Sequence, residues 1–317
     1  MPLFSLDKWY FDVLDEDNHY LFLYFARARL AGRSQTHFHL SAARLGDLGI
    51  AAVHVPLTEA ETVWEPDVIK TEYGVMRWNA HETTIRFTYR DMDASLRYRQ
   101  CGYDFPRNSS LMIPAACGSR ILWTPAAIRC AVDGEVRISD RRFSFHNHDG
   151  YYDRLESNVF PFFSPVRRLL WGRLHRGRFV LTYTVAEGKP SSPKWTKAVL
   201  SDGKNKSVFE KMRVTVLEER FSEALQCKYP VRYDLSAENA DAALSISAER
   251  IQEAVVSDFM KDQQMTNRVQ ALIYRGISRN PRGVKFFSKA SIRVTGGKIR
   301  HELTDVVFID EFVRFGG

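Results

Sequence analysis

Hydrophobic and polar residues alternate with a period of two along most of the chain, which is typical of β-strands. In HYLFLYFARARL (19–30), the even-numbered positions fall on one face of a strand and the odd-numbered positions on the other. The same alternation recurs in THFHLSAARL (36–45), TTIRFTYR (83–90), ASLRYRQ (94–100), AIRCAVDGEVRI (127–138), RFVLTYTV (178–185), SVFEKMRVTVLEER (207–220) and ASIRVTGGKIRHEL (290–303). β-Branched and aromatic residues enrich these runs, so they predict many short strands.

Turn signals separate several of these strands. Asp133-Gly134 and Gly296-Gly297 lie between alternating runs, as expected of tight hairpin turns. Short strands joined by such turns favour an antiparallel barrel or sandwich. We therefore predict an all-β protein.

Few segments have a helical pattern, and one has the composition of a linker. SPVRRLLWGRL (164–174) has apolar residues at helical spacing, whereas AENADAALSISAERIQEAVV (237–256) fits either a helix or a long strand. Gly, Pro, Ser and Lys concentrate in residues 186–207, which predicts a linker. We expect an N-terminal barrel over 1–188 that carries the site and a smaller C-terminal barrel over 189–317.

The composition narrows the class of protein. A chain of 317 residues, with 44% hydrophobic and 13% aromatic residues, is long enough for two medium domains and too hydrophobic to be disordered. Arg27 and Arg29 interrupt the longest apolar run, which is then too short for a spanning helix. The N-terminal MPLFSLDKWYFD lacks the basic start and apolar block of a signal peptide, which predicts a cytoplasmic protein.

Charge, cysteines and motifs exclude several functions. The net charge is +7, but the basic residues are dispersed and form no Lys/Arg block, so we expect no nucleic-acid partner. The cysteines are far apart, without a CxxC pair, and predict free thiols (Cys101, Cys117, Cys130 and Cys227). No GxSxG, HExxH, P-loop or GxGxxG motif supports a hydrolase, an NTPase or a nicotinamide-dependent enzyme.

Several segments, in this order, resemble the carotenoid 1,2-hydratase (hydroxyneurosporene synthase) and AttH-like family. They are WYFDVLDEDNHYLFLYF (9–25), GVMRWNAHETTIRF (74–87), ILWTPAAIRCAVDGEVRI (121–138), HNHDGYYD (146–153) and LLWGRLHRGRFVLTYTV (169–185). The resemblance covers about the first 185 residues and extends to the second half only in general strand character. It implies two consecutive lipocalin-like antiparallel β-barrels with few short helices.

The resemblance also implies an apolar pocket near the domain junction that takes a hydrophobic polyene or terpenoid-like substrate. The hydratases add water to a terminal C=C bond, and related fungal proteins guide decalin-forming cycloadditions. Such chemistry implies a hydrophobic small-molecule partner and no cofactor. Peripheral contact with a membrane, as a route to the substrate, is left open.

Asp153 is the acid that the resemblance selects, because Gly150-Tyr151-Tyr152-Asp153 matches the family's G-Y-x-D element. Adding a proton to an alkene needs a protonated carboxyl group, and burial favours that form. Aromatic faces such as Tyr151 and Tyr152 attract the cation that results. The structural alternative is that Asp153 caps a turn or pairs with Arg154.

The residues after Asp153 depart from the family, which usually has a small or polar residue, an asparagine and a glycine there. This chain has Arg154, Leu155, Glu156 and Ser157. Arg154 beside Asp153 would favour the ionised carboxylate. The departure therefore favours cyclisation, isomerisation or binding of another substrate over strict carotenoid hydration.

Two histidine pairs raise the question of a metal. His146 and His148 share a face of a strand, as do His37 and His39, and the pairs could together bind a divalent ion. We favour hydrogen-bonding histidines and predict no metal, with His148 tuning Asp153 or acting as a base and His146 contacting the substrate.

Other residues complete the predicted site. The catalytic set is Asp153, His148 and Tyr152. The predicted substrate-binding set is Tyr151, His146, Trp78, Asn79, Trp123, Arg77 and Trp171. Trp9 and Tyr10 also match aromatic positions of the family, and Arg129 fits a strand-edge ion pair better than a ligand contact.

We thus expect a cofactor-independent lyase or isomerase/cyclase that acts on a polyene by acid-assisted hydration, cyclisation or isomerisation. One alternative is a non-catalytic lipid- or polyene-binding protein. The other is a Diels–Alderase-like pericyclase that holds a polyene in a reactive fold without an acid.

Overall fold

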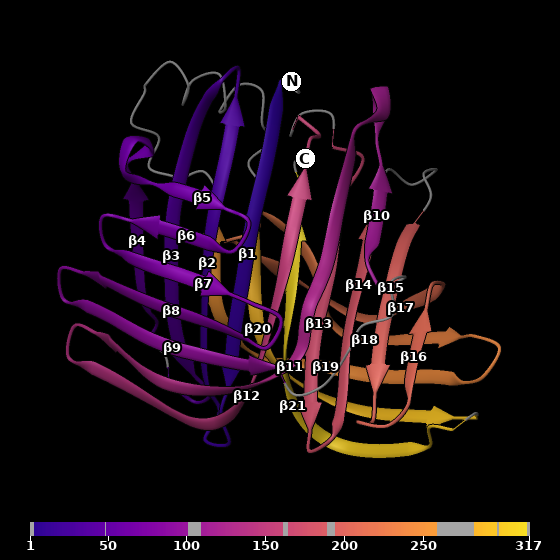
Figure 1. The fold of residues 1–317 in the computed structure, drawn as a ribbon. Helices are drawn as coiled ribbons and strands as arrows, with labels where there is room; N and C mark the ends of the chain where they lie inside the picture. The colour runs from indigo at the N-terminus through magenta and orange to yellow at the C-terminus, as the bar shows by residue number, and fades with distance from the viewer. Residues whose placement is uncertain are drawn as a thin grey trace. The chain divides into compact units, whose positions relative to one another are not determined.

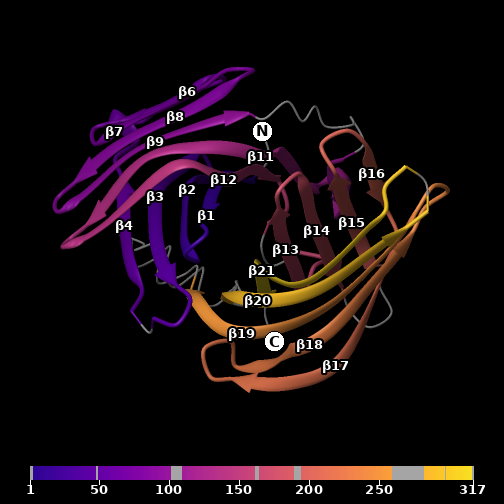
Figure 2. The same cartoon turned by 90° about the horizontal axis from the view of Figure 1, so that it is seen from below.

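A computed structural model describes residues 3–47, 49–100, 109–160, 164–188, 194–258, 282–296 and 298–315 (Figure 1). Almost all of their regular structure is β-strand, and the helical elements among them are the 3₁₀ turns η1 (Glu59–Glu61) and η2 (Ala116–Gly118). The strands form two curled antiparallel half-barrel sheets (Figure 2). The predicted all-β class is confirmed.

The first sheet has the order β4-β3-β2-β1-β12-β11-β9-β8-β7-β6-β5. Its strands are β1 (Phe4–Leu14), β2 (His19–Leu30), β3 (Arg33–Arg44), β4 (Ala51–Leu57), β5 (Val63–Glu65), β6 (Val68–Thr71), β7 (Gly74–Trp78), β8 (Glu82–Tyr89), β9 (Met92–Gln100), β11 (Arg120–Ile138) and β12 (Arg141–Ser157). A further short strand, β10, spans Leu111–Pro114.

The second sheet has the order β16-β15-β14-β13-β21-β20-β19-β18-β17. Its strands are β13 (Arg168–Arg176), β14 (Phe179–Glu187), β15 (Lys194–Ser201), β16 (Lys206–Phe209), β17 (Met212–Ser222), β18 (Cys227–Glu238), β19 (Ala243–Asp258), β20 (Arg282–Thr295) and β21 (His301–Arg314). The two sheets share one feature of their topology. In each, the strand that comes first in the chain pairs with the strand that comes last, β1 with β12 and β13 with β21.

The chain divides into two compact units, and the boundary between them lies N-terminal to the linker that we expected. One unit is Met1–Phe105 with Ser119–Phe160, and the other is Pro106–Gly118 with Pro161–Gly317. β14 and β15, which flank residues 189–193, pair with each other along their length. The Gly/Pro/Ser-rich stretch therefore falls inside the second sheet, and β13 and β14 belong to that sheet although we expected them in the first barrel.

Two local predictions also differ from the structure. The segment expected as a helix overlaps β13, whose residues pair with both β14 and β21. Of the two interpretations left open for residues 237–256, the strand is the one found, because the segment covers the end of β18 and most of β19. Asp133-Gly134 lies within β11 at a β-bulge rather than in a hairpin turn, and a Cβ on Gly134 would lie 2.0 Å from the carbonyl oxygen of Ser95. Of the other predicted turn, Gly296 follows β20 with a φ of +90° and Gly297 is outside the described residues.

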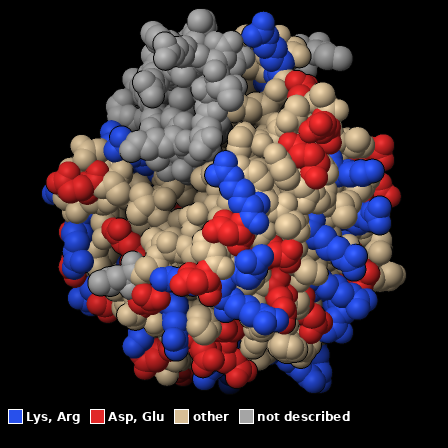
Figure 3. Space-filling model, turned by 90° about the vertical axis from the view of Figure 1, so that its left-hand side faces the viewer, with Lys and Arg blue, Asp and Glu red and all other residues tan. Residues whose placement is uncertain are grey.

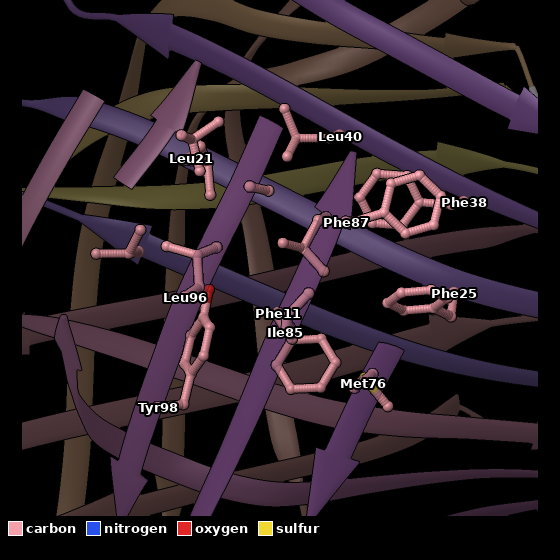
Figure 4. Packing of buried hydrophobic residues seen from close by; sticks show 14 of the residues in the cluster. Phe11, Leu21, Phe25, Phe38, Leu40, Met76, Ile85, Phe87, Leu96 and Tyr98 are labelled. Atoms are coloured by element: carbon pink, nitrogen blue, oxygen red, sulfur yellow. The ribbon is translucent and has the colours of Figure 1, made fainter. Parts of the chain in front are cut away.

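A hydrophobic core fills the interior of the first curled sheet (Figure 4). The rings of Phe38 and Phe87 stack there with centroids 4.0 Å apart and planes 18° apart. Phe11, Phe25 and Tyr98 add further rings from β1, β2 and β9. Close packing of large side chains is the dominant stabilising contribution in such a core.

Part of the first sheet is buried on both of its faces. β8 alternates between more and less buried positions, as a strand with one covered face does. In β2, by contrast, every residue from Tyr20 to Ala26 is buried. The odd-numbered members of this run lie in the core, so the even-numbered members form a second buried face. The continuous apolar and aromatic run in the sequence is typical of a strand covered on both sides.

Gly150, the glycine of the Gly-Tyr-Tyr-Asp element, lies within β12 and does not form a turn. A Cβ at this position would lie 2.3 Å from Cγ2 of Val132 and 3.0 Å from the carbonyl oxygen of Asp12. Glycine is therefore required here by space, because neighbouring strands leave no room for a methyl group.

Replacing Gly150 by alanine is expected to lower the free energy of unfolding of the first unit by about 1–3 kcal/mol, because the added methyl group overpacks the β1/β11/β12 contact. Urea unfolding of the Gly150→Ala variant measures this. Ser144→Ala, at an exposed position of the same strand, is the control and should change the value by less than about 0.5 kcal/mol. Equal stability of the two variants would contradict the steric explanation.

Candidate functional site

The second buried face of the first sheet is polar and aromatic, in contrast to the core on the opposite face. We call this surface the second face. Its buried polar and aromatic members are Tyr10 and Asp12 of β1, Tyr20, Phe22 and Tyr24 of β2, His37, His39 and Ser41 of β3, Trp123 of β11, and Tyr151 and Asp153 of β12. Strand alternation selects these residues, and antiparallel register places them beside one another.

Asp153 accepts two hydrogen bonds on one oxygen of its carboxyl group. The indole Nε1 of Trp123 donates to Oδ2 at 2.9 Å, and the hydroxyl of Tyr151 donates to the same atom at 2.8 Å. The side chain of Asp153 is almost fully buried, with 7% of the residue exposed.

A second carboxyl group, Asp12, lies on the same face one step along the strands. The hydroxyl of Tyr10 donates to Oδ2 of Asp12 at 3.0 Å. Tyr10 also shares a hydrogen bond with the hydroxyl of Tyr20, and Tyr20 is the donor when Tyr10 donates to Asp12. Tyr10 and Tyr151 meet edge to face, with ring centroids 6.3 Å apart, so the two carboxyl groups belong to one aromatic cluster.

Arg154 does not pair with Asp153, although the two residues are adjacent in sequence. Its guanidinium group binds Asp7 through Nε and Nη2, both at 2.9 Å, and lies 3.2 Å from Glu156. The hydrogen bond to Asp7 is the largest influence that raises the pKa of Arg154. Adjacent residues of a strand point to opposite faces, so the positive charge of Arg154 is directed to the other side of the sheet.

The same alternation separates Tyr152 from Asp153. Tyr152 packs in the core, where its ring stacks on Phe11 at 5.2 Å and burial raises its pKa. Its hydroxyl accepts a hydrogen bond from Nε2 of Gln100. Tyr151 lines the second face with Asp153, whereas Tyr152, which we predicted as a catalytic neighbour of Asp153, does not.

The two histidines of β12 also lie away from Asp153. His148 is half-buried and meets the ring of Phe145 edge to face at 6.0 Å, about 16 Å along the strand from Asp153. His146 is exposed. The structure therefore does not bring the predicted base His148 or the predicted contact His146 to the carboxyl group.

The remaining predicted contacts are dispersed. Trp78 packs against Trp9 on the core side, with ring centroids 5.0 Å apart. Asn79 is exposed, and its Oδ1 accepts the backbone N–H groups of residues 81 and 82 in the turn before β8. Arg77 is exposed, and Trp171 is buried on β13 of the second unit. Trp123 is the one predicted tryptophan that hydrogen-bonds to Asp153 in the described part of the chain.

Arg129 forms the ion pair that we favoured over a ligand contact. Its Nε donates to Oδ1 of Asp149 at 3.0 Å, between neighbouring strands β11 and β12.

The other histidine pair, His37 and His39, lies on the second face next to His54 of β4. Nδ1 of His39 and Nε2 of His54 share a hydrogen bond at 2.8 Å, and Oγ of Ser41 lies 2.6 Å from Nε2 of His39. The ring of His39 stacks on Tyr24 at 4.9 Å. Within the described residues, no group of three or more His, Cys, Asp or Glu side chains has the arrangement of a metal site.

Sequence reasoning missed most of the second face, namely Asp12, Tyr20, Tyr24, Ser41 and His54 as site residues. The signal was present in Trp9-Tyr10-Phe11-Asp12 and in the run at 20–26, where the polar-tipped residues Asp12, Tyr20 and Tyr24 all fall on the positions that alternate with core residues. A polar-tipped side chain in a strand that is buried on both faces requires a partner on its own face. Asp12 and the tyrosines therefore predict a hydrogen-bonded cluster.

Solved structures with the same fold cover almost the whole chain. CghA in complex with Sch210972 is 16% identical, with a TM-score of 0.68 over 98% of this chain and 88% of that chain. An AttH-like protein (NE1406) of Nitrosomonas europaea is 12% identical, with a TM-score of 0.69 over 98% of this chain and 93% of that chain. Kievitone hydratase of Nectria haematococca is 10% identical, with a TM-score of 0.59 over 97% of this chain and 88% of that chain.

These likenesses show the two-domain lipocalin-like fold that the sequence resemblance implied. No protein-family model and no curated protein sequence matches the chain. The described residues contain no helix that is long and apolar enough to cross a membrane.

His37 makes the stability of the first unit depend on pH. Burial, followed by the charges of His54 and Lys8, lowers the pKa of His37 from 6.5 to about 3. Below about pH 6.5 the unfolded chain binds a proton that the folded chain does not, so stability is greatest above that pH and falls toward pH 3. The loss is about 1.4 kcal/mol per pH unit in this window.

The His37→Gln variant is expected to lose this contribution, so its free energy of unfolding should fall less steeply between about pH 6 and pH 4. Urea unfolding at a series of pH values measures the slope. His146→Gln, which removes an exposed imidazole, is the control. A slope for His37→Gln equal to that of the parent protein would contradict a buried, neutral His37.

Proposed function

We propose that the protein is a cofactor-independent enzyme that acts on a hydrophobic polyene or terpenoid-like substrate, with Asp153 as the acid. The reaction class is acid-assisted hydration, cyclisation or isomerisation at the second face. The observation that supports this proposal most is the buried carboxyl group of Asp153. It accepts hydrogen bonds from Trp123 and Tyr151, and the guanidinium group of Arg154 binds Asp7 instead. Burial in general favours the protonated form of a carboxyl group, which is the form that donates a proton.

The aromatic rings around Asp153 supply what the chemistry needs next. Transfer of the carboxyl proton of Asp153 to an alkene carbon forms a C–H bond and leaves a cation on the neighbouring carbon. The faces of Tyr10, Tyr151 and Trp123 lie on the same side of the sheet and can stabilise such a cation through their quadrupoles. Burial of all three residues keeps bulk water away from the cation, which then gains a chosen nucleophile or loses a proton.

Two of the similar structures support this class of function, one through its enzyme name and the other through the compound bound in its crystal structure. Kievitone hydratase is named for addition of water, and CghA was crystallised with the small molecule Sch210972. At 10–16% identity these proteins share the fold with this chain, so the proposal rests on the second face. The finer assignment to carotenoids or terpenoids comes from the sequence resemblance.

A pericyclase and a binding protein are the competing functions. Both would use the aromatic second face, and neither would need the proton of Asp153. The burial of Asp153 favours the acid mechanism over both, because a carboxyl group is costly to desolvate and an apolar binding surface does not need one.

The charges on one face of the molecule bear on the predicted absence of a nucleic-acid partner. On the face in Figure 3, Lys and Arg side chains are interspersed with Asp and Glu among the described residues. Nucleic-acid binding relies on a continuous basic patch. Peripheral contact with a membrane, as a route to the substrate, stays a prediction of the sequence.

Binding can be tested without the natural substrate. The fluorescent tetraene cis-parinaric acid should bind the protein and quench its tryptophan emission by energy transfer. Because Asn keeps an oxygen acceptor for Trp123 and Tyr151, the Asp153→Asn variant should bind the probe within about threefold of the parent affinity. Failure of the parent protein to bind any polyene probe would contradict the proposed ligand class.

Conversion is tested by deleting the gene in its own organism and isolating the compound that accumulates, which then serves as the substrate for the purified protein. We expect Asp153→Asn to lower kcat by at least about 100-fold. Asp149→Asn, the same change four residues earlier on β12, is the matched control and should retain activity. A mass gain of one water identifies a hydratase, and an unchanged mass identifies a cyclase or isomerase.

Full conversion by Asp153→Asn would overturn the acid mechanism and favour the pericyclase. A deletion strain with no accumulating compound would favour the binding protein.

A further inference from the structure

Cross-strand register aligns five residues of the second face in one row. Asp153 of β12 lies opposite Tyr10 of β1, Tyr10 lies opposite Tyr24 of β2, and Tyr24 lies opposite His39 of β3. His54 of β4 follows opposite His39. Three strand spacings therefore separate Asp153 from His39, a span of about 14 Å. The row has a carboxyl group near one end, two tyrosine rings in the middle and two imidazoles at the other end.

The imidazoles form a hydrogen-bonded chain that begins at Ser41. Oγ of Ser41 lies 2.6 Å from Nε2 of His39, and Nδ1 of His39 lies 2.8 Å from Nε2 of His54. Neutral imidazole has one donor and one acceptor nitrogen, so this chain has two forms that differ by moving each proton along one bond. A chain with two such forms can accept a proton at one end and release another at the opposite end.

The ends of the chain have different surroundings. Ser41 is fully buried on the second face, whereas His54 is half-buried on β4, the edge strand of the first sheet. Nδ1 of His54, at the far end of the chain, is itself buried, so a proton that enters at Ser41 is held by the histidine pair inside the fold. The ring of Tyr24 stacks on His39 with planes 18° apart, which favours a transient imidazolium.

Nearby groups limit where a positive charge resides at rest. The ammonium group of Lys8 lies 4.4 Å from the ring centroid of Tyr24, on the same face as the histidines. His37 meets Tyr24 edge to face at 5.6 Å and stays neutral, because burial lowers its pKa to about 3. The ammonium group of Lys8 disfavours a second cation beside it on this face.

We propose that Ser41, His39 and His54 form the proton-accepting relay of the site, opposite the proton-donating Asp153. The inference rests on the proposed function. In the first half-reaction the O–H bond of Asp153 breaks and a C–H bond forms on the substrate. In the second, a proton leaves the attacking water or a substrate O–H or C–H bond for Oγ of Ser41, while the Ser41 proton moves to Nε2 of His39.

If the proton leaves a C–H bond, the electron pair of that bond forms the new C=C bond; if it leaves an O–H bond, a lone pair of the oxygen forms the C–O bond and the O–H pair stays on oxygen, and in both cases the substrate ends neutral. Asp153 has lost one proton and the histidine pair has gained one, so exchange with solvent restores both. Ser41 is the catalytic contact, and His39 and His54 are positioning residues that act through it. The relay implies a substrate that reaches across the rings of Tyr10 and Tyr24, with its reacting ends about 14 Å apart or drawn together by folding of the chain.

The relay is tested with the compound that accumulates in the deletion strain and with purified variants. Ser41→Ala and His39→Gln are expected to lower kcat at least about tenfold, with probe binding within about threefold of the parent. In His54→Gln the acid limb of the pH–kcat profile should move to lower pH, because His39 loses the partner that shares its proton. A structural role would change protein yield or KM without moving this limb.

Rescue provides a second readout for His54. Added 4-methylimidazole should restore part of the activity of His54→Ala and none of that of Ser41→Ala. Val53→Ala, at the neighbouring half-buried position of β4, is the matched control and should need no rescue.

Outcomes for this relay and for the acid are distinguishable. If Asp153→Asn loses conversion while Ser41→Ala, His39→Gln and His54→Gln keep full activity and an unchanged pH profile, the relay is overturned and the proposed function stands. If the relay variants lose conversion with a shifted pH profile while Asp153→Asn keeps it, the relay stands and the acid is assigned wrongly. Soluble, folded variants are verified by circular dichroism before each comparison.

Discussion

Burial of both faces of β1, β2, β3 and β12 is the constraint on which the site depends. A strand directs successive side chains to opposite sides, so one set packs in the aromatic core and the other must find partners on the second face. Buried polar groups are costly without hydrogen bonds. Asp153 with Trp123 and Tyr151, Asp12 with Tyr10, and His39 with Ser41 and His54 are three solutions to the same requirement.

Alternation also explains why neighbouring residues of Gly-Tyr-Tyr-Asp-Arg have different surroundings. Tyr151 and Asp153 share the second face, whereas Tyr152 packs in the core and Arg154 binds Asp7 on the other side of the sheet. The arginine that would hold a neighbouring carboxyl group ionised is thereby kept from it. Gly150 lets β12 approach β1 and β11 closely enough for these contacts to form.

The strands and their faces could be predicted from the sequence, because a period of two is a local property. The 19–30 segment, for example, is β2 with the faces assigned from alternation. Pairing between distant strands is not local, so SPVRRLLWGRL was predicted as a helix and residues 186–207 as a linker between domains. For the site, Asp153, Tyr151 and Trp123 were selected by resemblance. His54, Ser41 and Asp12 needed the register of β1 to β4, which the sequence does not reveal.

The proposed ligand-binding surface is the second face, and not the core inside the first curled sheet. A crystal structure of the protein soaked with cis-parinaric acid tests this proposal most directly. We expect the tetraene to lie against the rings of Tyr10 and Tyr24 and to contact Asp153. A tetraene found among Phe11, Phe38 and Phe87 in the core would contradict it.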